Sequence, residues 1–71
     1  MEDKQAICDA LAATLRLTRN HSDLDHLEYK NDKKHDMEFV TVRWNGGTSR
    51  KVNVSLDSGT AMIRDIMKVI D

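Results

Sequence analysis

Residues 38–56, EFVTVRWNGGTSRKVNVSL, contain two alternating apolar runs on either side of a glycine pair. The apolar members all have even numbers: Val40, Val42, Trp44, Val52, Val54 and Leu56. A period of two is typical of strands that bury one face, and adjacent glycines supply the backbone freedom of a turn. We therefore predict a β-hairpin whose even-numbered side chains face a core.

The parity of these positions limits the length of the turn. A two-residue loop at Asn45-Gly46 would place valines and polar residues on the same face, because a shift of one residue turns a strand over. A loop of three or five residues pairs even positions with even positions. Of the registers that such loops allow, we expect the one that pairs Val42 with Val52, Val40 with Val54, and Trp44 with Arg50.

The segments before and after the hairpin are predicted to form two helices that cover one of its faces. A helix from Glu2 to about Leu17 places Ile7, Leu11 and Leu15 on one stripe. A second helix, 59–70, begins after an N-cap at Asp57 or Ser58. Its apolar positions form a wide arc: Met62, Ile63, Ile66, Met67, Val69 and Ile70.

A short strand is expected over His26–Lys30, before a polar turn. Its side chains reach the core face if Tyr29 lies opposite Val40 and Leu27 lies opposite Val42. The predicted order is helix, strand, strand, strand, helix. We expect one α+β domain over residues 1–71, with a three-stranded antiparallel meander and both helices on one face.

Composition removes several classes of function. Eleven basic residues nearly balance twelve acidic ones, which gives no general attraction to nucleic acid or to an anionic membrane. A single cysteine fits a reducing compartment. The first residues lack a cationic segment followed by a long apolar core, and no apolar run approaches the length of a membrane span. We expect a cytoplasmic protein.

No pattern indicates catalysis, a cofactor or a metal. His21, His26 and His35 lack the spacing of metal ligands, and Cys8 fits a small buried side chain on the first helix. Phosphate-loop, dinucleotide-binding, nucleophile-elbow and metalloprotease motifs are absent. We therefore predict a protein that is not an enzyme, without catalytic residues, cofactor or bound metal.

The odd-numbered side chains of the hairpin define the candidate interaction surface. It consists of Met37, Phe39, Thr41, Arg43, Lys51 and Asn53. In the expected register Arg43 lies opposite Lys51, and such like charges call for compensation, for example by Glu28. We expect contact with a protein partner or self-association into a homodimer, the latter through Met37, Phe39 and the arc of the last helix. The alternative is a nucleic-acid-binding module that uses this surface.

Two resemblances accompany these patterns. The order of elements is similar to that of double-stranded-RNA-binding domains, a family that contacts phosphates through a lysine-rich start of its last helix. Residues 56–62, LDSGTAM, carry no lysine, and no functional residue is transferred. Residues 39–42, 45–47, 51–54 and 57–65 resemble short uncharacterised proteins of prophage-like regions in Gram-positive bacteria. That resemblance implies a small phage-associated or accessory protein.

Overall fold

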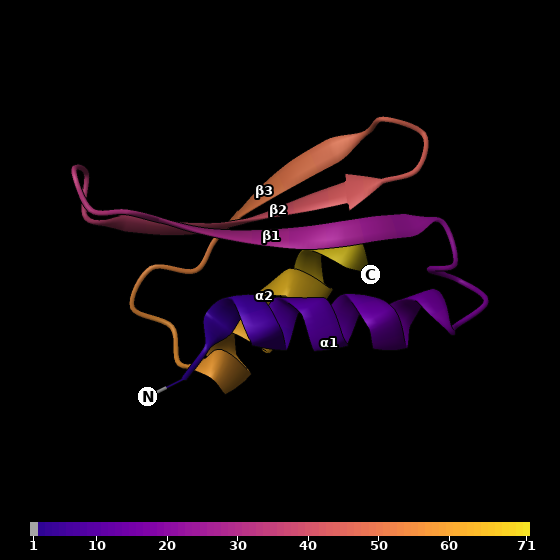
Figure 1. Cartoon of the computed structure of the whole chain (residues 1–71), viewed down its shortest axis with the longest axis horizontal. Helices are drawn as coiled ribbons and strands as arrows, with labels where there is room; N and C mark the ends of the chain where they lie inside the picture. Colours follow the sequence, from indigo (N-terminus) through magenta and orange to yellow (C-terminus); the bar gives the residue numbers. More distant parts are fainter. Residues whose placement is uncertain (1) are drawn as a thin grey trace.

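The computed structural model describes residues 2–71, and its elements follow the predicted order (Figure 1). They are α1 (Lys4–Arg16), β1 (Leu24–Asp32), β2 (Met37–Trp44), β3 (Ser49–Asn53) and α2 (Gly59–Ile70). The strands form one antiparallel sheet in the order β1-β2-β3, and both helices lie on the same side of it. This two-layer arrangement confirms the predicted α+β fold class.

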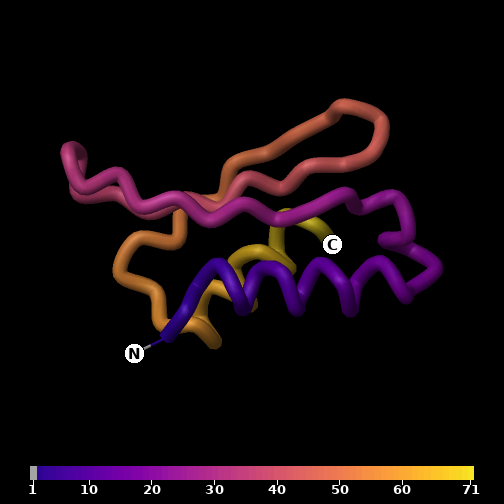
Figure 2. The backbone as a smooth tube through the Cα atoms, viewed as in Figure 1, coloured from indigo at the N-terminus to yellow at the C-terminus, as the bar shows by residue number. Residues whose placement is uncertain are grey.

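Both helices begin at a side-chain cap. The Asp3 carboxylate accepts a hydrogen bond from the Ala6 amide at 3.0 Å, and the Ser58 hydroxyl accepts one from the Ala61 amide at 3.2 Å. Ser58 is one of the two predicted caps of α2. Figure 2 shows the two helices running in the same direction with their starts adjacent, where the Gly59 amide donates to the Glu2 carboxylate at 2.9 Å.

The core lies between the sheet and the two helices. Its side chains are at most 7% exposed: Cys8, Ala12, Leu15, Leu24, Leu27, Val40, Val42, Val52, Val54, Met62 and Ile66. The buried line of α1 therefore runs through Cys8, Ala12 and Leu15, whereas Ile7 and Leu11 of the predicted stripe are only partly buried. The difference arises because α1 packs mainly on β1 and turns its other flank toward α2.

The pairing of β1 with β2 follows the predicted register. Leu27 lies opposite Val42, and Tyr29 lies opposite Val40. The strand is longer than expected, since it begins at Leu24 and ends at Asp32. An irregularity in the pairing between Leu24 and His26 leaves one extra residue in β1, as in a β-bulge, and this keeps Leu24 in the core.

The pairing of β2 with β3 corrects the expected register by two residues. Val40 lies opposite Val52, and Val42 lies opposite Arg50. The loop thus has three residues, 45–47, closed by a hydrogen bond from the Trp44 amide to the Thr48 carbonyl at 2.9 Å. Gly47 has a φ of 90°, which glycine adopts without steric cost. The prediction that the even-numbered valines face the core is confirmed. The change of register does not affect it, because loops of three and five residues both pair even positions with even positions.

Leu56 departs from the alternation that predicts it in the core. It is 99% exposed and has a φ of 65°, in the left-handed region. β3 ends at Asn53, and the Asp57 amide donates to the Val54 carbonyl at 3.0 Å. The chain must turn there to reach α2 under the sheet, and this turn directs the Leu56 side chain into solvent.

Candidate interaction surface

The face of the sheet away from the helices carries all six predicted surface residues. Side chains that lie opposite each other in paired strands share a face, and Thr41 pairs with Lys51 while Phe39 pairs with Asn53. Arg43 and Met37 alternate with the buried valines of β2 and therefore join them. We call this the open face. It is formed by Met37, Phe39, Thr41, Arg43, Lys51 and Asn53.

β1 adds titratable residues to the open face beyond the six predicted ones. The β1 residues opposite the open-face side chains of β2 are His26, Glu28, Lys30 and Asp32. The signal was already present in the predicted pairing of Leu27 with Val42, because the residues between core positions must point the other way. The open face thus holds basic and acidic side chains side by side.

Arg43 does not lie opposite Lys51, which corrects the expected clash of like charges. Its partner on β3 is Ser49. The Glu28 carboxylate lies 3.9 Å from the Arg43 Nε on the other side, so the compensation expected from Glu28 is present. Lys51 instead places its Nζ 5.5 Å from the centre of the Phe39 ring, within the range of a cation–π contact. The half-buried aromatic ring and its cation form the middle of the open face.

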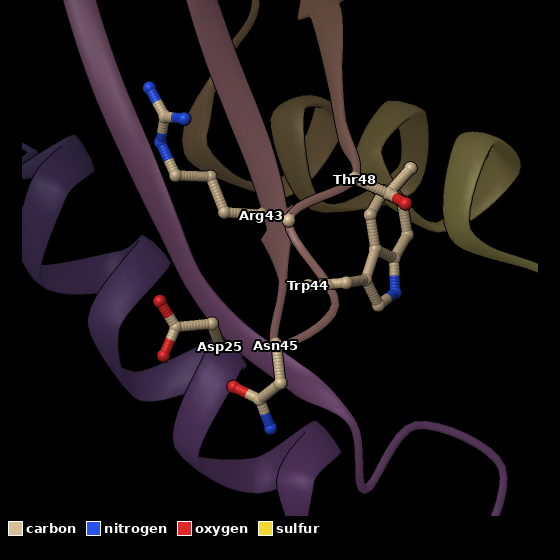
Figure 3. Close-up of a pocket in the computed structure, with 6 residues that line it drawn as sticks. Asp25, Arg43, Trp44, Asn45 and Thr48 are labelled. Carbon is tan, nitrogen blue, oxygen red and sulfur yellow. The ribbon is translucent and has the colours of Figure 1, made fainter.

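An open hollow of about 310 Å³ lies at the hairpin end of the sheet (Figure 3). Its lining includes Asp25, Arg43, Trp44, Asn45 and Thr48. Figure 3 shows Arg43 and Trp44 leaving β2 in opposite directions, with the indole ring beside Thr48. The donors and acceptors of this lining suit a polar group of a binding partner.

The surroundings of Cys8 and His35 fit a role in folding and not a role in catalysis. Cys8 is fully buried, and burial raises the pKa of its thiol to about 11, which keeps it in the unreactive neutral form at neutral pH. His35 bonds the Asp32 carboxylate at 2.8 Å, and this bond lowers the pKa of Asp32. Within residues 2–71, no three histidine, cysteine or carboxylate side chains come together as metal ligands.

On the helix side, an ion pair that sequence reasoning missed joins α1 to β2. Lys4 Nζ lies 2.5 Å from a Glu38 carboxylate oxygen, which also accepts a hydrogen bond from the Tyr29 hydroxyl at 3.0 Å. The hydrogen bond with Lys4 lowers the pKa of Glu38, and the same bond raises the pKa of Lys4. Only the tertiary structure brings these residues together, since they come from three different elements.

Comparison of the chain with protein-family models, with curated protein sequences and with solved structures finds no significant match in any of the three. None of the helices within residues 2–71 has the length and apolar character needed to cross a bilayer.

Proposed function

We propose that this chain is a protein-interaction module without catalytic chemistry of its own, and that it binds its partner through the open face. The observation that carries this proposal is the placement of both helices on one side of the sheet. The opposite side has no covering element within residues 2–71, although Phe39 lies at its middle. An aromatic residue surrounded by polar and charged side chains is typical of protein-binding surfaces.

The charges of the open face favour a protein over a nucleic acid. A phosphate backbone calls for a surface of one sign, with several basic residues along its path. Here Glu28 lies near Arg43, and Asp32 stands on the same face as Lys30. Interspersed charges instead suit a partner that presents both signs, which is the usual condition at the rim of a protein interface.

The geometry limits how two copies could associate. Met37 and Phe39 lie on the open face, whereas the apolar arc of α2 lies on the helix side. One symmetric contact joins the same patch on both copies, so it cannot use both surfaces at once. A homodimer built on the open face therefore leaves α2 outside the interface.

A photo-crosslinking residue placed at Thr41, in the middle of the open face, tests the proposal in cells that produce the protein. The matched control carries the same residue at Ala13, an exposed position on α1. We expect covalent adducts with protein from position 41 and not from position 13. Equal adducts from both positions, none from position 41, or adducts chiefly with nucleic acid would refute the proposed function. Light scattering of the pure protein identifies a second copy as the partner if it gives a dimer mass.

A further inference from the structure

The two outer edges of the sheet differ in how their backbone groups are satisfied. In a strand at an edge, the N–H and C=O groups of alternate residues point away from the sheet. Such groups are a template for another strand unless something covers them. β1 and β3 are the edge strands here, and only one of them is covered by hydrogen bonds from elsewhere in residues 2–71.

Side chains of α1 cover the outer edge of β1. The Gln5 amide group donates to the Leu27 carbonyl at 3.2 Å and accepts from the Tyr29 amide at 2.8 Å. Farther along the same edge, Arg16 donates to the Asp25 carbonyl at 2.7 Å. These three bonds occupy positions that an added strand would need, so the β1 edge is blocked over most of its first half.

The outer edge of β3 has no such cover. The Trp44 amide bonds the Thr48 carbonyl, and the Val54 amide bonds the Glu38 carbonyl, so the even-numbered residues of this segment turn their backbone groups toward β2. The alternation then directs outward the backbone groups of Ser49, Lys51 and Asn53. Within residues 2–71, no hydrogen bond from another element reaches these groups.

The positive charge of the β3 edge favours binding of an acidic segment. Residues 39–56 contain three basic side chains and no acidic one. Arg50 and Lys51 are exposed and belong to none of the ion pairs formed within residues 2–71. An antiparallel second copy that used all of β3 would place Lys51 opposite Lys51 of that copy, which is unfavourable. Lys51 lies on the open face, whereas Arg50, opposite the buried Val42, lies on the helix side. A strand with carboxylates on the open-face side would instead meet Lys51.

The helix side of the same edge offers room for apolar side chains. A hollow of about 380 Å³ lies there, lined by Asp23, Trp44, Gly46, Thr48 and Arg50. The half-buried indole ring supplies its apolar surface. Because side chains of a strand alternate between the two faces, an added strand would place apolar residues over this hollow and acidic residues beside Lys51.

We propose that the outer edge of β3 accepts an extended segment of the partner protein as a fourth strand, and that this segment alternates acidic and apolar residues. The proposal rests on the proposed function and extends its surface from the open face to the adjoining edge. Main-chain hydrogen bonds would supply affinity, and the carboxylates would supply specificity.

The test uses blocked peptides of roughly seven residues, enough to span the five residues of β3. The first peptide alternates glutamate and valine, the second alternates lysine and valine, and the third is the glutamate peptide with alternate amides N-methylated. We expect the glutamate peptide to bind about tenfold more tightly than either control. Amide hydrogen exchange at Ser49 and Lys51 should slow on binding, while exchange at the already bonded Tyr29 amide should not change.

A charge-reversed variant makes the test specific to this edge. The Lys51 side chain is exposed, so the variant Lys51→Glu should fold and should prefer the lysine peptide. Equal binding of all peptides, binding insensitive to N-methylation, or exchange changes confined to other strands would each overturn the proposal. If the peptides fail while crosslinking at Thr41 succeeds, the proposed function stands and only the added strand is wrong.

Discussion

Replacing Leu56 by glycine should stabilise the protein, although it removes a large apolar side chain. Leu56 has a φ of 65°, and an L-residue in this left-handed region costs about 1–2 kcal/mol. Its side chain is 99% exposed, so the substitution sacrifices no buried surface. Glycine adds freedom to the unfolded chain, which offsets about 0.4–1 kcal/mol of the gain. The net expectation is a stabilisation of about 0.5–1 kcal/mol.

Urea unfolding monitored by the single tryptophan, Trp44, provides the assay. In thermal unfolding, the same gain in free energy would raise the melting temperature by about 2–8 °C for a domain of this size. Leu17→Gly is the matched control, since Leu17 is 88% exposed but has a φ of −78° at the end of α1. Glycine should lower stability there by about 0.5–1 kcal/mol.

The same experiment separates the observed position of Leu56 from the one that alternation predicts. A leucine buried at the end of β3 would lose its packing on replacement by glycine, at a cost of about 2–5 kcal/mol. A loss of more than about 1 kcal/mol in the free energy of unfolding would refute the outward orientation and the strain argument together.

Three further outcomes follow from single contacts. Gln5→Ala should cost about 1–3 kcal/mol and speed exchange of the Tyr29 amide, because the bonds that cover the β1 edge are lost. Iodoacetamide should modify Cys8 about a hundredfold more slowly than a free thiol, with urea removing the difference; fast labelling of the native protein would contradict the pKa near 11. Asp57→Asn should stabilise the protein at neutral pH, because Asp65 raises the pKa of Asp57.

The pH dependence of the last variant follows from the direction of that shift. A carboxyl whose folded-state pKa is raised stabilises the fold below the ordinary aspartate pKa of about 3.9, and this contribution is lost as the pH rises through the folded-state value. One oxygen of Asp57 is also shielded from solvent without a hydrogen-bond donor. The gain from asparagine should therefore shrink as the pH falls toward 4, and a gain that is constant with pH would contradict this explanation.

The alternation along the hairpin by itself determined that Val40, Val42, Val52 and Val54 are buried. The need for Leu27 and Tyr29 to share that face gave the pairing of β1 with β2. Both are local properties, because parity and capping depend on neighbours in the chain. The predicted helix 59–70 and its cap at Asp57 or Ser58 are of the same kind, and the structure selects Ser58.

The tertiary structure decided the features for which local sequence patterns allow more than one outcome. Three- and five-residue loops bury the same valines, so only the hydrogen bonds across the Trp44–Thr48 turn select the register. The outward turn of Leu56 depends on where α2 must begin beneath the sheet. The two edges of the sheet differ because Gln5 covers β1 and no side chain within residues 2–71 covers β3 in the same way. Contacts between residues as distant in the chain as Gln5 and Tyr29 have no periodic signature in the sequence.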